Sequence, residues 1–373
     1  MSLIIAEIGT SHEGSLEKAK DLIDAAVSSG ADAVKFQWVY ADEILHPDTG
    51  FVSLPTGAIR LYDRFKGLEC SVDFFQRLCE YARKKSAQFV CSPFGLKSFR
   101  ELISINPDYV KIASPELNHY PLLNALREHR EKQKSAGKNA IPVILSSGVS
   151  HLTDIEAALE IVGRENVSLL HCVTSYPAPE SEYNVRLITN LKNIFGVETG
   201  VSDHSLDASL IPVLSVMCGA SVIEKHITLS RKTDGLDDPV ALEPEQFSEM
   251  VHEVHQAEAV LRHYGETVGG EKIIAQLSEK IPREKIMACL GDGVKKLAAS
   301  EKENYSRTNR SLHYMKDIQA GERIAASDMA VLRTEKTLSV GVSACFLPVL
   351  SGKRLFHDVK SGDGVKLEDF LYE

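Results

Sequence analysis

Two histidines end consecutive β-type segments of the chain, VSDH at His204 and VIEKH at His226, with little more than one helix between them. Side chains alternate along a strand, so Ser202 shares a face with His204, and Glu224 shares a face with His226. Singly, each histidine is better explained as a core or surface residue bonded to backbone. At matched ends of neighbouring parallel strands, the pair with its nearby carboxylate favours a divalent cation site or a catalytic role.

Eight short apolar segments precede such polar positions, and amphipathic helical patterns follow most of them. This alternation predicts a (β/α)8 TIM barrel, in which the carboxyl ends of the strands build the active site. An open, doubly wound sheet is the alternative, which the lack of a glycine-rich loop after the first strand disfavours. The expected strands are 3–8, 33–38, 88–92, 109–114, 142–147, 167–172, 198–204 and 221–227.

Lys35 and Lys111 fall inside two of these buried strands, where a charge is costly unless it faces an anion. Small hydroxyl side chains stand at neighbouring strand ends and can donate to phosphate or carboxylate oxygens. The mouth of the barrel is therefore predicted to bind a phosphorylated acid. In the alternative interpretation, the serines only close the strands and the lysines pair with barrel glutamates.

The chain divides into three parts by pattern: a barrel over 1–265, a linker with one helix over 266–305, and a small β-rich domain over 306–373. Within the last part, DIQAGERIAASD from Asp317 is echoed by DVKSGDGVKLED from Asp358. Two copies of a turn-plus-strand unit predict a pseudo-symmetric domain.

Composition limits the class of partner. The formal net charge is −10, which argues against a nucleic-acid or anionic-membrane surface, so an anionic ligand must be held by local charges. The seven cysteines are scattered without a CxxC pair, which predicts reduced thiols in a cytoplasm. We find neither a signal-peptide pattern nor an apolar run of membrane-spanning length.

With these residues placed, the chain resembles the sialic acid synthase family, which condenses phosphoenolpyruvate with an N-acetylated hexosamine. The resemblance extends over nearly the whole length and lies in the order of several short motifs. They are AEIGTSHEG from Ala6, KFQ from Lys35, SPF from Ser92, KIAS from Lys111, LSSG from Leu145, LHC from Leu170, SDH from Ser202, EKH from Glu224 and NRSL from Asn309.

The resemblance implies a barrel followed by an antifreeze-like SAF domain of the β-clip type. It implies that a divalent cation, Mn2+ or Mg2+, binds at His204 and His226. It also implies a homodimer in which each antifreeze-like domain closes the partner's barrel and delivers Arg310. The matching positions for phosphoenolpyruvate are Lys35, Ser92, Lys111, Ser114, Ser146 and Ser202, and those around the sugar and the reacting carbons are Glu7, Gln37, Glu116, Tyr176 and Asp237.

In this interpretation the cation polarises the sugar aldehyde, and Glu7 or Glu116 stabilises positive charge at the enol carbon. The catalytic set is then Glu7, Lys35, Glu116, His204 and His226. Two departures from the family pattern, Pro115 for glycine and Thr174 for asparagine, leave the sugar open.

The leading function is thus a synthase of sialic, legionaminic or pseudaminic acid. A metal aldolase or lyase on the same barrel would not need two phosphate-facing lysines. A degenerate sugar-binding relative is disfavoured because the charged set is retained as a whole.

Overall fold

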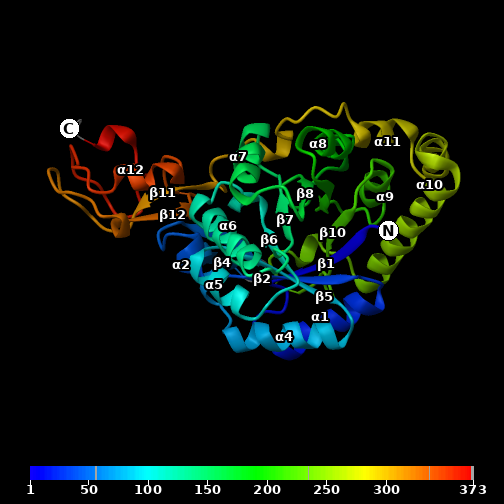
Figure 1. Ribbon diagram of the computed structural model, residues 1–373, viewed down its shortest axis with the longest axis horizontal. Helices are drawn as coiled ribbons and strands as arrows, with labels where there is room; N and C mark the ends of the chain where they lie inside the picture. Colours follow the sequence, from blue (N-terminus) through cyan, green and yellow to red (C-terminus); the bar gives the residue numbers. More distant parts are fainter. Residues whose placement is uncertain (55–56, 234, 336, 371–373) are drawn as a thin grey trace.

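The computed structural model describes residues 1–54, 57–233, 235–335 and 337–370. Its larger part is a closed barrel of eight parallel strands in the order β1-β10-β9-β8-β7-β6-β5-β2 (Figure 1). All eight predicted strands are confirmed, with ends within two residues of the expected ones. They are β1 (Leu3–Gly9), β2 (Ala33–Trp38), β5 (Gln88–Pro93), β6 (Tyr109–Ile112), β7 (Val143–Ser146), β8 (Val167–Cys172), β9 (Glu198–Asp203) and β10 (Val222–His226).

The interior of the barrel has an apolar layer below a polar one. Ile5, Ala33, Val90, Ile144, Leu170 and Val222 form a separate buried cluster inside it. Because strand side chains alternate, the residue two positions further along each strand also points inward, but nearer the carboxyl end. Those positions are occupied by Glu7, Lys35, Ser92, Ser146, Cys172 and Glu224.

Helices surround the strands, and the main core lies between the helices and the outer face of the barrel strands. Serine caps begin two of them: Ser15 accepts from the backbone of Lys18, and Ser71 accepts from that of Phe74. The helices of the barrel are α1 (Leu16–Ser28), α4 (Val72–Lys84), α5 (Leu96–Ser104), α6 (Tyr120–Ser135), α7 (Leu152–Val162), α8 (Leu187–Phe195), α9 (Leu210–Met217) and α10 (Pro244–Ser278).

Two parts of the chain differ from expectation. After β2, the chain adds α2 (Ala41–Ile44), a hairpin of β3 (Phe51–Leu54) and β4 (Gly57–Arg60), and α3 (Leu61–Lys66), none of which the apolar pattern indicated. The predicted linker is also more ordered than expected. Helix α10 continues beyond a bend at Gly265, and α11 (Arg283–Leu290) follows it. Ile273 and Ile286 are buried in the barrel's core, which explains why this segment is helical.

The small domain has its own core and the predicted internal repeat. Strand β11 (Arg310–Tyr314) pairs antiparallel with β12 (Met329–Arg333), and a short helix, α12 (Leu347–Leu350), follows. Ile318 and Val359, equivalent positions of the two copies, form an antiparallel bridge and exchange backbone hydrogen bonds of 3.1 and 2.9 Å. The pseudo-symmetry is therefore present, although residues 336 and 371–373 of the predicted domain lie outside the described residues.

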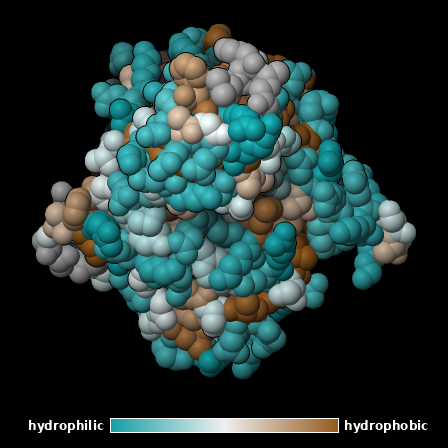
Figure 2. Space-filling model, turned by 90° about the vertical axis from the view of Figure 1, so that its left-hand side faces the viewer, coloured by the Kyte–Doolittle hydropathy of each residue, from teal (hydrophilic) through white to brown (hydrophobic). Residues whose placement is uncertain are grey.

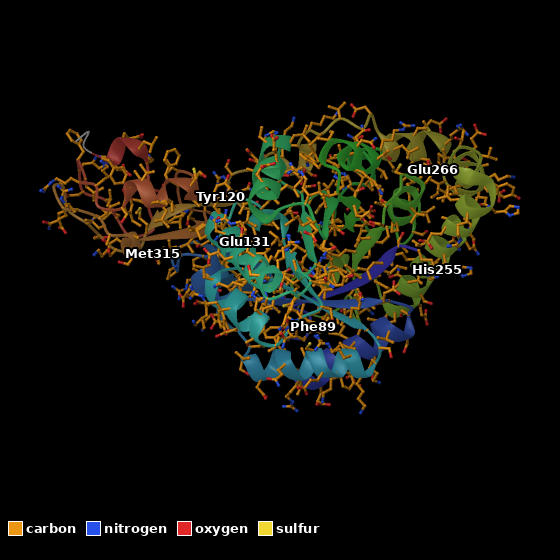
Figure 3. All side chains as sticks on the ribbon, in the orientation of Figure 1. Phe89, Tyr120, Glu131, His255, Glu266 and Met315 are labelled. Carbon is orange, nitrogen blue, oxygen red and sulfur yellow. The ribbon has the colours of Figure 1, made fainter. Side chains whose placement is uncertain are left out.

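The small domain lies at one end of the molecule, beside α2 and α6 (Figure 1). Figure 3 shows Met315 in this domain at the opposite end from Glu266 on α10. Figure 2, which faces the small domain, shows a mostly hydrophilic surface with hydrophobic residues in small, separate groups. In the part of the chain that the structure describes, no helix combines the length and apolar character that crossing a membrane requires.

Candidate active site

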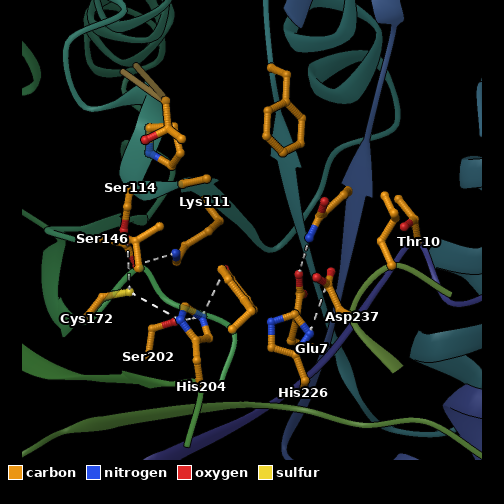
Figure 4. A pocket seen from close by; sticks show the side chains of 18 of the residues that line it. Glu7, Thr10, Lys111, Ser114, Ser146, Cys172, Ser202, His204, His226 and Asp237 are labelled. Atoms are coloured by element: carbon orange, nitrogen blue, oxygen red, sulfur yellow. Dashed lines mark hydrogen bonds and ion pairs between the residues drawn. The ribbon is translucent and has the colours of Figure 1, made fainter. Parts of the chain in front are cut away.

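A cavity of about 380 Å³ opens at the carboxyl ends of the barrel strands (Figure 4). It brings together most of the residues that the sequence singled out, from seven of the eight strands or the loops after them. The predicted site residues that line it are Glu7, Lys35, Gln37, Lys111, Ser114, Ser146, Thr174, Tyr176, Ser202, His204, His226 and Asp237.

Two lysines face one carboxylate on the floor of this cavity. The Nζ atoms of Lys35 and Lys111 lie 3.7 and 3.6 Å from Oε1 of Glu224, which also accepts a 2.8 Å hydrogen bond from Ser202. Burial opposes the charge on Glu224, but the two lysines hold its pKa below the ordinary value. Burial lowers the pKa of Lys111, whose Nζ donates to Ser146 at 2.5 Å. The floor therefore brings two lysine ammonium groups close together, and these can donate to the oxygens of an anion.

Glu7 lies beside Lys35, with 2.7 Å between Oε2 of Glu7 and Nζ of Lys35. Its other oxygen accepts a 2.8 Å hydrogen bond from the Gln37 amide. Burial raises the pKa of Glu7, while the charge of Lys35 acts in the opposite direction. Burial also raises the pKa of Asp237, to about 6, with a further contribution from Glu7. The cavity thus holds two carboxyl groups with raised pKa values, and that of Asp237 allows proton exchange near neutral pH.

The two predicted histidines are neighbours, with ring centroids 5.5 Å apart. Nδ1 of His204 lies 2.9 Å from the Val173 carbonyl oxygen, and its Nε2 faces the Tyr176 hydroxyl at 3.3 Å. Nδ1 of His226 lies 4.0 Å from Oδ2 of Asp237. Burial and the neighbouring His204 lower the pKa of His226 well below 6.5, so His226 is neutral.

This donor set fits a divalent cation that takes most of its ligands from water and substrate. The Val173 carbonyl accepts from Nδ1 of His204, so Nε2, which faces the Tyr176 hydroxyl, is the nitrogen that would bind the metal, as in many protein metal sites. Burial opposes a charge on His204, yet Cys172 beside it raises the pKa of His204 to about 9, so metal binding would release a proton. Among the described residues no group of three or more histidine, cysteine or acidic side chains surrounds one point, so the protein offers the two imidazoles.

Three predicted site residues are not among the described residues that line the cavity. Ser92 is fully buried on β5, and its hydroxyl has no hydrogen-bond partner among the described groups. Glu116 is also fully buried, with Oε2 2.6 Å from Nε of Arg310 and Oε1 2.9 Å from Nη2 of Arg333. Burial raises the pKa of Glu116, but the charges of Arg310 and Arg333 lower it by more, so the pKa lies below its ordinary value.

Arg310 therefore fixes the small domain to the barrel in this structure, and Arg333 takes the place at the cavity that we expected for Arg310. The Arg310 guanidinium also donates to the carbonyls of Glu43 and Phe94, at 2.6 and 2.7 Å. All of these partners belong to the same chain. Contact between Arg310 and a partner's barrel stays a prediction.

Several cavity residues were not predicted from the sequence. Cys172 could have been found, because it lies two residues beyond Leu170 on the inner face of β8. Glu224 was noted for its shared face with His226 but was not assigned to the site. Thr10 and Phe94 lie in the quoted motifs AEIGTSHEG and SPF but were given no role. Other residues brought in from outside the barrel strands gave no sequence signal: Phe65, Leu236, Asn304, Thr308, Arg333 and Glu335.

Comparison with known proteins agrees with this architecture. A model of the NeuB family matches residues 22–266, and a model of the SAF domain matches residues 309–371. The crystal structure of the spore coat polysaccharide biosynthesis protein SpsE from Bacillus subtilis is 31% identical, with a TM-score of 0.78 over 100% of this chain and 96% of that chain.

Two further relatives are named as synthases. The N,N'-diacetyllegionaminic acid synthase of Campylobacter jejuni is 31% identical over 94% of this chain and 95% of its own length. The structure of the N-acetylneuraminic acid synthetase of Leptospira borgpetersenii, in complex with citrate, is 30% identical, with a TM-score of 0.60 over 81% of this chain and 90% of that chain. The chain therefore belongs to the NeuB family, and it is an enzyme of the synthase type with a SAF domain after its barrel.

Proposed function

We propose that this protein is a phosphoenolpyruvate-dependent nonulosonate synthase that adds the three-carbon unit to an N-acetylated hexosamine and releases phosphate. The observation that carries the proposal is the cavity floor, where Lys35 and Lys111 face Glu224 below a ring of serine hydroxyls. An overall acidic protein needs such a concentration of local positive charge to hold a small trianion.

In the proposed reaction, the methylene carbon of phosphoenolpyruvate bonds to C1 of the open-chain sugar, whose carbonyl oxygen takes up a proton. Water then adds at the former enol carbon, and the C–O bond to phosphate breaks. Phosphoenolpyruvate, sugar and water thus give the nonulosonate and inorganic phosphate. The lysines hold the phosphate and carboxylate groups, while Ser114, Ser146 and Ser202 donate to their oxygens.

Glu7 and Asp237 are the groups that we assign to proton transfer, because both line the cavity and both have raised pKa values. Glu116 has a different environment, since both of its oxygens contact arginines of the small domain. We therefore assign Glu116 to closure of the site. Tyr176 and Gln37 line the side of the cavity that we assign to the sugar.

A divalent cation, Mn2+ or Mg2+, held by His204 and His226, would supply Lewis-acid polarisation of the sugar carbonyl. His226 is neutral and so ready to ligate, and Tyr176 orients His204 from the cavity side.

Phosphate release from phosphoenolpyruvate, measured against a panel of N-acetylated hexoses with mass spectrometry of the product, tests the proposal. We expect release that depends on the sugar and a product heavier than the sugar by the three-carbon unit. Sugar-dependent release without a new carbon–carbon bond would point to a phosphatase. Cleavage of a nonulosonate without phosphoenolpyruvate would point to a lyase.

His226→Ala should abolish turnover while the barrel stays folded, because one of two imidazole ligands is lost. Calorimetric titration with Mn2+ should show one site in the wild type and none in the variant. His255→Ala is the control, since His255 lies partly exposed on α10 (Figure 3) and does not line the cavity. Full activity of chelator-treated wild-type enzyme would contradict the metal assignment.

The sugar preferred over N-acetylmannosamine is proposed to be a diacetamido hexose, the precursor type of legionaminic or pseudaminic acid. Thr174 lines the cavity where the sialic acid enzymes are expected to have asparagine, and threonine has no amide to donate to a hydroxyl. Thr174→Asn should shift the ratio of kcat/KM values toward N-acetylmannosamine by about tenfold.

The matched control for this shift is Thr153→Asn, because Thr153 is exposed on α7. A wild-type preference for plain N-acetylmannosamine would refute the diacetamido assignment.

A further inference from the structure

The segment between α11 and the small domain passes over the barrel mouth and contacts two loops of the active site. We call residues 301–309 the clamp segment. One loop follows β7 and includes Val149; the other follows β8 and includes Thr174. Both residues lie beyond the ends of their strands, so the barrel's own hydrogen-bond ladder does not fix them.

The clamp segment holds Val149 at both backbone groups. The N–H of Val149 donates to Oε1 of Glu301 at 2.8 Å, and its carbonyl accepts from the Asn309 amide at 3.1 Å. Val149 has a φ of 41°, a left-handed conformation that a β-branched residue adopts only when its surroundings impose it. The two contacts with the clamp segment supply that constraint.

Thr174 is held in the same way. Its N–H donates to the same Oε1 of Glu301 at 2.7 Å, and its carbonyl accepts from the Asn304 amide at 3.5 Å. Glu301 is 1% exposed, so these charge-assisted hydrogen bonds are shielded from water. One carboxylate oxygen therefore ties the backbones of two adjacent loops together.

The two loops fit against each other without spare room. A Cβ added at Gly148 would lie 2.0 Å from Oγ1 of Thr174, and the Gly148 N–H donates to Ser114 at 3.0 Å. A small shift of either loop would therefore move the Thr174 side chain, which lines the cavity. Lys295, just before the clamp segment, adds a contact by donating to the Ser147 carbonyl at 2.8 Å.

We propose that Glu301 is a positioning residue that sets the β7 and β8 loops relative to each other and so shapes the sugar side of the active site. Ser146 and Lys111 lie within strands and keep their places without it. The phosphoenolpyruvate side should therefore depend on Glu301 much less. The identity of the two substrates rests on the proposed function, whereas the placement of the loops does not.

The test compares Glu301→Ala and Glu301→Gln with Glu303→Gln, an exposed glutamate two residues away. Amide hydrogen exchange should become about tenfold faster or more in peptides covering 147–151 and 173–176 of Glu301→Ala, while the rest of the barrel is unchanged. In the same variant, kcat/KM for the sugar should fall on the order of 100-fold. The KM for phosphoenolpyruvate should change less than about threefold.

Glu301→Gln keeps the oxygen that accepts both N–H groups, so its amide exchange and its kcat/KM for the sugar should lie between those of Glu301→Ala and the wild type. Glu303→Gln should match the wild type. If Glu301→Ala fails to fold, Glu301→Gln alone must still show the faster local exchange and the sugar-selective loss. Unchanged exchange in both loops, or equal loss toward both substrates, would overturn the proposal. A wild type that turns over no sugar in the panel would reject the proposed function, while the exchange result would still decide the role of Glu301.

Discussion

Lys111→Met should lower kcat/KM for phosphoenolpyruvate on the order of 10²–10³-fold and leave the KM for the sugar within about threefold. Lys111 is 2% exposed and supplies one of the two positive charges on the cavity floor. Methionine has a similar length and no charge, so the change removes the ion contact while filling the same space. Steady-state kinetics with each substrate varied in turn measures the two effects separately.

The partner of Lys111 adds to the expected loss. Without Lys111, Glu224 keeps Lys35 and Ser202 as partners among the described residues, and it repels the incoming anion. A buried charge that loses one partner is costly even before substrate binds. The variant should therefore also be less stable, and saturation with inorganic phosphate should stabilise it less than it stabilises the wild type.

Lys225→Met is the matched control. Lys225, on strand β10, is buried to the same degree, but it bonds to Asp203 at 2.5 Å and does not line the cavity. Its loss should lower stability and affect both substrates alike. Equal effects of Lys111→Met on both substrates would show that Lys111 is structural as well.

Much of the fold followed from the period of the apolar residues. The eight strands have continuous apolar runs because both of their faces are buried, and such runs are visible without any long-range information. The α2–β3–β4–α3 insertion was missed because it packs as a small satellite, with Ile44, Leu45 and Leu61 in a cluster of their own. After Gly265 only one helix was predicted, whereas the structure has the end of α10 and then α11, because few positions there, such as Ile273, face the core.

The site was predictable to the extent that strands position it. Glu7, Lys35 and His226 lie where the alternation of strand side chains puts them, on the inner face near the carboxyl end. Arg310 and Arg333 show the limit of this reasoning. Both lie on strands of the small domain, and nothing local to either residue indicates which one reaches the cavity and which one reaches Glu116.

Glu116→Gln should lower the free energy of unfolding by about 3–5 kcal/mol, because it leaves the buried Arg310 without its counter-charge. Arg333 loses its partner as well, although it is less buried. The small domain should then separate from the barrel at lower denaturant concentration, with faster proteolysis between residues 291 and 309. Denaturant unfolding and limited proteolysis measure these two effects.

The stabilisation that Glu116 provides depends on pH, because the pKa of Glu116 is lowered in the folded protein. The carboxylate contributes its full stabilisation above its ordinary pKa of 4.5 and loses it as the pH falls through the lower folded value. The difference in free energy of unfolding between wild type and Glu116→Gln should therefore be constant at neutral pH and disappear in acid. Glu131→Gln is the control, since Glu131 forms a 3.9 Å pair with Arg127 and is 66% exposed (Figure 3). A loss no larger than that of Glu131→Gln would contradict the role of the buried contact.

The same contact decides whether two chains exchange their small domains, as we propose for a homodimer. Exchange would form the Glu116–Arg310 pair between one chain's barrel and the other chain's small domain, with no new chemistry. Glu116→Gln and Arg310→Met should each be inactive alone, because neither closes the barrel. The two variants are then mixed and allowed to exchange subunits. A heterodimer with swapped domains contains one site with both changes and one site with neither. Because random pairing makes half of the dimers heterodimers, activity should return toward a quarter of the wild-type value. If the pair forms within each chain, as in the single chain described above, every site carries one change and heterodimers stay inactive, which would reject the exchange.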